Sequence, residues 1–233
     1  NYQTPTPEEC SEAELLADEL GISPVLCRLL RKRGIRTAAD TKKFFRPSLL
    51  DIHDPFLLDG MEAAVKRLNK ALGRKERILV YGDYDVDGTT SVALVYSFLK
   101  RHFGEEKLDF YIPNRYTEGC GISYQGIEFA KEKGISLVIA LDCGIKAVEK
   151  VGYAKSLGID FIICDHHTPG EALPDAVACL DAKREDCTYP DKNLSGCGVG
   201  FKLMQAFCRV NNYKEQELLE YLDLLVVSIA SDI

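Results

Sequence analysis

Five short apolar runs, separated by helical patterns, dominate the sequence from Arg77 onward. The runs are continuous and do not alternate with polar residues, which is typical of parallel strands buried on both faces. A strand, a turn and a helix recur every ~25–30 residues, as in right-handed βαβ units. The predicted strands are residues 77–82, 108–112, 137–142, 160–164 and 176–181. The predicted helices are residues 88–102, 123–133, 145–157, 198–211 and 214–229. We therefore expect an α/β fold with a parallel β-sheet of about five strands sandwiched by helices.

The residues before Arg77 predict a helical N-terminal subdomain. Residues 1 to about 10 read as a lead-in, and the pattern from there to about residue 46 is helical. Apolar residues recur at three- and four-residue spacings: Leu15, Leu16, Leu20, Val25, Leu26, Leu29 and Leu30. The pair Ser23-Pro24 predicts a helix start, and Thr37 predicts a second one. We expect a lead-in and helical subdomain over residues 1–56. A helix over residues 57–72 then enters a main domain over residues 57–233.

The composition limits where the protein works. No apolar run approaches the ~20 residues of a membrane span, so we expect no membrane association. The N-terminal residues are polar and acidic, unlike a secretory signal. Nine cysteines are present and none forms a Cys-x-x-Cys pair. Free buried thiols in a reducing cytoplasm explain this pattern better than disulfides or a zinc site.

The net charge of −7 argues, taken alone, against a nucleic-acid partner. The charge is unevenly spread, however. One stretch is strongly basic, and Asp40 is its only acidic residue. Its basic residues are Arg28, Arg31, Lys32, Arg33, Arg36, Lys42, Lys43 and Arg46. A solvated helical face is the simplest interpretation of this stretch.

Acidic residues and histidines gather where three predicted strands end. The first strand runs into Asp83, Asp85 and Asp87, the third into Asp142, and the fourth into Asp165-His166-His167. Parallel strands of one sheet end at the same edge, so the three clusters should converge. Carboxylates and imidazoles at ~4 Å suit a cation between them, and we predict a site for two divalent ions.

Each cluster also has a simpler interpretation. If the loop is extended, the alternating aspartates share one face of it. The next residues, Thr89-Thr90-Ser91, are predicted to open a helix whose first backbone N–H groups could bind an anion. The same string resembles the start of an EF-hand calcium loop, but the distal Glu and the flanking helices are missing. Asp142 alone would be a helix cap. Asp165 can bond an imidazole N–H, which leaves the second histidine for the substrate. Asp232 alone is only an acid near the end of the chain.

The ordered motifs resemble the DHH phosphoesterase superfamily. They are residues 80–88, 141–145 and Asp165-His166-His167. Further stretches resemble the RecJ-type single-stranded-DNA exonucleases within it: residues 16–23, 54–58, 111–115, 118–121 and 194–203.

The resemblance implies two Mn²⁺ or Mg²⁺ ions and 5′→3′ exonucleolysis of single-stranded DNA in repair and recombination. Carried over by motif, the implied metal ligands are Asp83, Asp85, Asp87, Asp142, His166 and Asp232. Asp142 would bridge the ions, and His167 would contact the scissile phosphate. Candidate contacts to the strand are Arg115, Lys183, Ser195 and Gly198. The sequence identifies no protein partner, and a single-strand-binding protein or a helicase stays open.

Two other functions fit the same motifs. A DHH phosphoesterase acting on pyrophosphate, short oligonucleotides or cyclic dinucleotides is one, although the basic N-terminal stretch and residues 195–203 argue against it. A non-catalytic binding module is the other, although every residue of the metal motif is present.

Three departures from the RecJ pattern stand out. Cys120 replaces a usual aromatic residue, and Asp181-Ala182-Lys183 replaces an Asn-Pro-basic turn. RecJ proteins also continue past the equivalent of Ile233 into further domains. We therefore expect this chain to be the N-terminal portion of a longer enzyme, and to be weak or inactive as a nuclease by itself.

Overall fold

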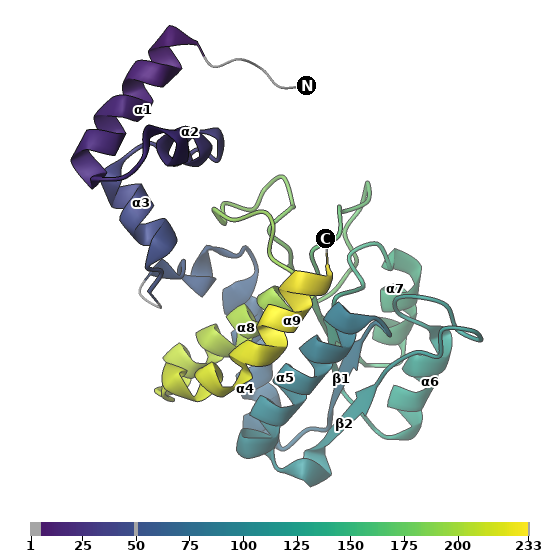
Figure 1. Cartoon of the computed structure of the whole chain (residues 1–233). Helices are drawn as coiled ribbons and strands as arrows, with labels where there is room; N and C mark the ends of the chain where they lie inside the picture. The colour runs from purple at the N-terminus through teal and green to yellow at the C-terminus, as the bar shows by residue number, and fades with distance from the viewer. Residues whose placement is uncertain (1–5, 49–50, 233) are drawn as a thin grey trace. The chain divides into compact units, whose positions relative to one another are not determined.

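The computed structural model describes residues 6–48 and 51–232. It divides the chain into two compact units, Asn1–Ile52 and His53–Ile233 (Figure 1). The functional domains expected over residues 1–56 and 57–233 stay a prediction. Across the described ranges, every helix is too short or too polar to cross a lipid bilayer.

The described residues of the N-terminal unit form the α-helices α1 (Pro7–Leu20), α2 (Pro24–Lys32) and α3 (Ala38–Phe45). The expected lead-in to residue 10 is wrong from Pro7 onward, and residues 1–5 lie outside the described residues. The helix starts early because Thr6 and Glu9 form a capping box, in which each side chain accepts the other residue's backbone N–H. The helix starts predicted at Ser23-Pro24 and at Thr37 are confirmed.

The second unit is built on the predicted parallel sheet. The strands are β1 (Ile78–Gly82), β2 (Leu108–Tyr111), β3 (Leu137–Leu141), β4 (Asp160–Cys164) and β5 (Ala178–Leu180). All pairs are parallel, in the order β2-β1-β3-β4-β5. The strand order reverses between β1 and β3, and the carboxyl ends flanking such a switch point are where open α/β sheets bind ligands.

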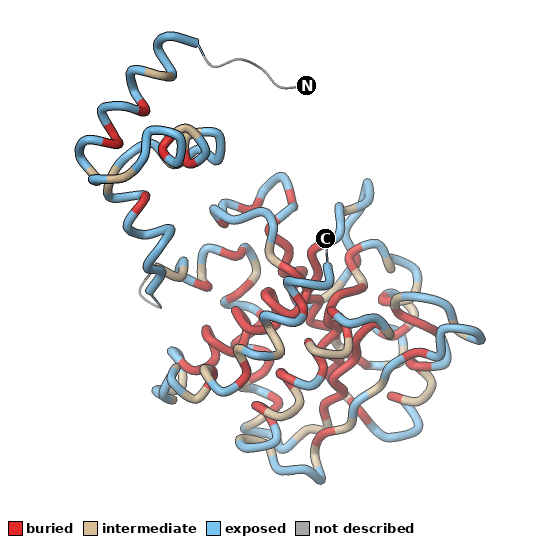
Figure 2. The backbone as a smooth tube through the Cα atoms, viewed as in Figure 1, coloured by how far each residue is buried: buried red, intermediate tan, exposed pale blue. Residues whose placement is uncertain are grey.

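Both faces of this sheet are covered, as Figure 2 shows by the buried residues along it. Ile78 and Val80 face one hydrophobic core, and Leu79 and Tyr81 face the other. The first core includes residues of α4 (Met61–Arg74), α5 (Val86–Phe103) and α8 (Gly196–Asn211). The second includes residues of α6 (Tyr124–Glu132) and α7 (Val148–Ser156). The continuous apolar strands follow from this double burial.

Two predicted helices differ from the structure in form. The helix expected over residues 214–229 is a 3₁₀ helix, Glu215–Tyr221, followed by α9 (Leu222–Ser231). Leu218 and Tyr221 are both buried, and a spacing of three fits the tighter 3₁₀ winding. The helix expected over residues 57–72 is preceded by a 3₁₀ turn, Pro55–Leu57, and starts only at Met61. One more 3₁₀ turn, Glu105–Lys107, precedes β2.

Candidate metal centre

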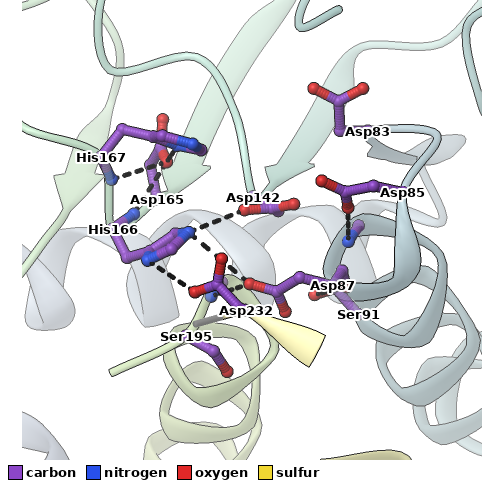
Figure 3. A network of polar contacts seen from close by, with 12 residues as sticks. Asp83, Asp85, Asp87, Ser91, Asp142, Asp165, His166, His167, Ser195 and Asp232 are labelled. Atoms are coloured by element: carbon purple, nitrogen blue, oxygen red, sulfur yellow. Dashed lines mark hydrogen bonds and ion pairs between the residues drawn. The ribbon is translucent and has the colours of Figure 1, made fainter. Parts of the chain in front are cut away.

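Residues that follow three strands at one edge of the sheet bring the carboxylates of Asp87 and Asp142 to the imidazole of His166 (Figure 3). The Nε2 atom of His166 lies 3.0 Å from Oδ1 of Asp142 and 3.6 Å from Oδ2 of Asp87. Asp87 follows β1, Asp142 follows β3, and His166 follows β4. The convergence expected for parallel strand ends is therefore present.

Asp232 completes the group from the end of α9. Its Oδ2 atom lies 3.4 Å from Nδ1 of His166, on the other side of the ring from Asp142. Two sets of three ligand atoms lie within 4.8 Å of one another: Asp87, His166 and Asp232, and Asp142, His166 and His167. Carboxylate oxygens with an imidazole suit divalent ions such as Mn²⁺. Because His166 belongs to both sets, one residue links the two halves of the centre.

Asp142 is held in an unusual position by the end of β3. Its backbone has a φ of 58°, in the left-handed region that few residues other than glycine adopt. Gly196 packs so closely that a Cβ atom there would lie 2.5 Å from the Cβ atom of Asp142. Burial raises the pKa of the Asp142 carboxyl group, and the nearby carboxylates of Asp87 and Asp85 raise it further. A cation beside Asp142 would offset both the cost of burying its charge and its repulsion from the carboxylates of Asp87 and Asp85.

Asp87 lies in the first turn of α5 and is anchored to α8. Its carboxylate accepts the backbone N–H groups of Gly196 and Cys197 at 2.6 and 2.8 Å. It also accepts the hydroxyl of Ser228, from α9, at 2.7 Å. The first N–H groups of a helix lack partners within the helix, so the start of α8 is a natural seat for this carboxylate.

The expected extended loop with three aspartates on one face is wrong. The backbone turns into α5 already at Val86, because Asp85 caps the helix by accepting the N–H of Gly88 at 2.9 Å. Asp83 lies apart from the group around His166 in Figure 3. Its two oxygens accept the backbone N–H groups of Tyr84 and Gly121, at 2.7 and 3.0 Å. The metal-binding roles of Asp83 and Asp85 stay predictions.

The hydroxyls expected at the helix start lie inside the helix instead. Thr89, Thr90 and Ser91 donate to backbone carbonyls one turn earlier, those of Asp85, Val86 and Asp87. The helix begins before them, so they do not present free N–H groups to an anion.

Asp165 organises the histidine pair. Its Oδ2 accepts the N–H of Ile145 at 2.9 Å, and its Oδ1 lies 2.7 Å from Nδ1 of His167. Burial raises the pKa of Asp165, but the bonds from His167 and Ile145 outweigh it and hold the pKa below its usual value. The hydrogen bond with Asp165 raises the pKa of His167 to about 9. His167 is thus a half-exposed imidazolium at neutral pH, held by one nitrogen.

A cavity of about 310 Å³ opens beside His167. Its walls carry charged residues of both signs, among them Asp83, Asp142, Asp165, Lys146 and Lys150. Cys120, the departure noted in the sequence, lines the same cavity. The cavity gives a ligand access to the centre next to a cationic side chain.

The predicted strand contacts divide into two pairs. Arg115 and Lys183 are exposed, and the Arg115 guanidinium lies 5.2 Å from the centre of the Tyr84 ring, beside the acidic loop. Ser195 and Gly198 are buried at the start of α8, where Ser195 Oγ accepts the N–H of Gly198. Contact of any of the four with DNA stays a prediction.

Sequence reasoning missed two parts of the centre. No role of its own was predicted for Ser228, although its hydroxyl donates to Asp87 across the fold. Asp181 was noted only as a departure. It is buried after β5, and its Oδ2 atom has no hydrogen-bond partner among the described residues. The sequence did offer a signal for Asp181. Residues 176–181 were predicted as a strand, so Asp181 was expected at the same edge of the sheet as Asp165.

Comparison with known proteins adds family evidence to this geometry. The model of the DHH family, N-terminal domain, matches residues 77–229. The single-stranded-DNA-specific exonuclease RecJ of Bacillus subtilis is 44% identical over 191 residues, which are 82% of this chain and 24% of that protein. RecJ of Salmonella typhimurium is 37% identical over 231 residues, 95% of this chain and 38% of that protein. The chain thus spans well under half the length of these relatives.

Solved structures resemble the chain as well. RecJ from Thermus thermophilus in complex with Mn²⁺ matches with a TM-score of 0.77 and 26% identity, covering 100% of this chain and 31% of that one. Another exonuclease RecJ bound to manganese matches with a TM-score of 0.68 and 30% identity, covering 76% of this chain and 44% of that one.

Proposed function

The chain belongs to the DHH family, and on that premise we propose that it is the catalytic part of a metal-dependent phosphodiesterase that removes nucleotides 5′→3′ from single-stranded DNA. One observation carries the proposal: Asp87, Asp142 and Asp232 converge on His166. The names of the RecJ relatives support single-stranded DNA as the substrate. We also propose a role in DNA repair and recombination, which the RecJ-type resemblance implies.

Two Mn²⁺ or Mg²⁺ ions fit the donor set of this centre. Asp87 and Asp142 are almost fully buried, and within the described part of the chain their ion pairs are to His166 alone. Buried carboxylates without a Lys or Arg partner call for another source of positive charge. Asp87, Asp142, His166 and Asp232 would hold the ions, with Asp142 between them, and RecJ neighbours bound to manganese support this. When bound, such ions polarise a phosphoryl oxygen and lower the pKa of water.

His167 is the proposed contact to the scissile phosphate. Asp165 occupies its Nδ1 atom, so Nε2 is the nitrogen left for a ligand. In the metal-free chain, the hydrogen bond with Asp165 raises the pKa of His167 to about 9, which favours the protonated ring. An imidazolium can donate a charge-assisted hydrogen bond to a phosphate oxygen and balance the charge that develops there.

Arg115 and Lys183 are the proposed contacts to the DNA backbone, because Arg115 is exposed beside the acidic loop and Lys183 is exposed next to Asp181. Phosphate contacts of this kind position a strand and contribute to affinity irrespective of sequence. We extend the proposal neither to Ser195 nor to Gly198, since both are buried.

A cytoplasmic location is proposed from the cysteines. All nine are free thiols, and seven of them are buried. Free thiols of this number persist in a reducing compartment.

Hydrolysis of labelled strands tests the proposal. With Mn²⁺, mononucleotides should be released from the 5′ end of a long 5′-phosphorylated single strand, and not from the same strand in a duplex. The release should be weak or absent with this chain alone and clear with the longer enzyme expected to contain it. Asp142→Asn and His167→Ala should lower the rate by about 10²-fold or more, the usual cost of losing a group that stabilises charge in the transition state. Pyrophosphate, short oligonucleotides and cyclic dinucleotides form the comparison arm. Turnover confined to these small substrates, or equal rates in Asp142→Asn and wild type, would contradict the proposal.

A further inference from the structure

A chain of hydrogen bonds runs from the start of α8 to the carboxylate of Asp87. The backbone N–H of Gly198 donates to Ser195 Oγ at 3.1 Å. Ser195 Oγ lies 2.7 Å from Ser228 Oγ, and Ser228 Oγ donates to Asp87 Oδ1 at 2.7 Å. All four residues are buried. The chain joins α5, α8 and α9 directly behind the candidate metal centre.

The direction of every proton in this chain is fixed by its two ends. A backbone N–H can only donate, and an ionised carboxylate can only accept. Gly198 therefore donates to Ser195, so the Ser195 proton points to Ser228 and the Ser228 proton points to Asp87. Each hydroxyl donates one hydrogen bond and accepts one, and bonds aligned in this way strengthen one another.

The two oxygens of Asp87 consequently differ. Oδ1 accepts both Ser228 and the N–H of Cys197, and it is fully engaged. Oδ2 accepts one N–H, from Gly196, and lies 3.6 Å from Nε2 of His166. The serine chain thus turns one oxygen away and leaves the other facing the centre.

Ser228 also lies one helical turn before Asp232. The backbone N–H of Asp232 donates to the carbonyl of Ser228 at 3.1 Å. The residue that orients Asp87 therefore also anchors the turn that carries the other carboxylate of the same group, Asp87, His166 and Asp232.

We propose that Ser228 and Ser195 are positioning residues that set the metal affinity of the Asp87 side of the centre. This inference rests on the proposed function, because it assumes that Asp87 binds a divalent ion. Groups that orient metal ligands typically contribute 10–100-fold to affinity.

Calorimetric titration of the whole chain with Mn²⁺ tests the proposal without any nuclease assay. Ser228→Ala should weaken Mn²⁺ binding by roughly 10–100-fold, and Ser195→Ala should weaken it in the same direction. In a double-mutant cycle, Ser195→Ala should cost little more once Ser228 is replaced, because Ser195 acts through Ser228.

Ser91→Ala is the matched control. Ser91 is equally buried, and its hydroxyl also bonds Asp87 at 2.7 Å, but at the backbone carbonyl and not at the carboxylate. It should keep the wild-type Mn²⁺ affinity, while its metal-free melting temperature reports the cost of losing a buried hydroxyl. Equal losses of affinity in Ser91→Ala and Ser228→Ala would mean general loosening and would overturn the proposal.

Asp87→Asn separates this inference from the proposed function. If Asp87→Asn loses Mn²⁺ binding and Ser228→Ala keeps it, the positioning role is wrong and the metal centre stands. If Asp87→Asn binds Mn²⁺ as tightly as wild type, the metal centre itself is wrong, and the inference with it.

Discussion

The Oδ1 atom of Asp165 lies 2.7 Å from the Nδ1 atom of His167. The carboxylate is 1% exposed and is held by the N–H of Ile145 as well, whereas the imidazole side chain is 56% exposed. A fixed, buried carboxylate therefore orients a solvent-facing imidazole ring. The end of β4 thus sets the orientation of His167, which keeps one nitrogen free beside the cavity.

This pair makes the metal-free stability depend on pH. The pKa of His167 is raised to about 9 in the folded chain, against ~6.5 in an unfolded one. A raised pKa stabilises the fold fully below the unfolded value, and this stabilisation is lost as pH rises through the folded value. In EDTA at pH 6, wild type should have a higher melting temperature than His167→Gln. This difference in melting temperature should shrink as the pH rises to about 9. A difference independent of pH would contradict the pairing.

Replacing Asp142 should not weaken the metal-free fold. Burial and nearby carboxylates raise the pKa of Asp142, so its charge opposes folding at pH 8. Asp142→Asn keeps the shape and suits the left-handed backbone. Urea unfolding in EDTA at pH 8 should give a free energy equal to wild type or higher by up to ~2 kcal/mol.

The matched control for this measurement is Asp186→Asn. The hydrogen bond with Arg184 lowers the pKa of Asp186, so this substitution should destabilise slightly. A clear loss of stability in Asp142→Asn would show that Asp142 is structural.

The strands were predictable, and the polar network behind the centre was not. Runs such as residues 137–141 are apolar throughout because both faces of the sheet are covered, and this burial leaves a plain trace in the sequence. The loop after β1 was misread because Asp85 is a helix cap, which shares its residue type with a metal ligand. The Ser195–Ser228 bond joins residues 33 positions apart, and no local pattern encodes such a pair.

The close packing of Gly196 against Asp142 predicts a sharp contrast between two glycines. A Cβ atom on Gly196 would lie 2.5 Å from the Cβ atom of Asp142, so the Gly196→Ala substitution must displace Asp142. We expect a loss of ~1–3 kcal/mol in stability, together with weaker Mn²⁺ binding.

Gly152, inside α7, serves as the control, because a Cβ atom there would meet no neighbouring group within 4 Å. Gly152→Ala should stabilise by ~0.5–1 kcal/mol through helix propensity. Urea unfolding measures both variants, and equal effects would mean that the close approach to Asp142 is unimportant.

Arg115 should contribute to DNA affinity through one phosphate. Its guanidinium lies 5.2 Å from the centre of the Tyr84 ring beside the acidic loop. Arg115→Ala should weaken single-strand binding and reduce the slope of log affinity against log salt by ~0.7. Arg101 is the matched control, because it stacks similarly on Tyr221 at 5.6 Å but lies in the last turn of α5. An unchanged slope in Arg115→Ala, or an equal change in Arg101→Ala, would contradict the contact.

The most direct test of the metal centre is a calorimetric Mn²⁺ titration of the wild-type chain beside His166→Gln. His166 contacts Asp87 and Asp142 through Nε2 and Asp232 through Nδ1, so no other residue touches as many of the proposed ligands within the described centre. We expect the wild-type chain to bind two Mn²⁺ ions and His166→Gln to lose at least one of them. Wild-type binding that is absent, or that His166→Gln reproduces unchanged, would contradict the assignment of this edge of the sheet as a metal centre.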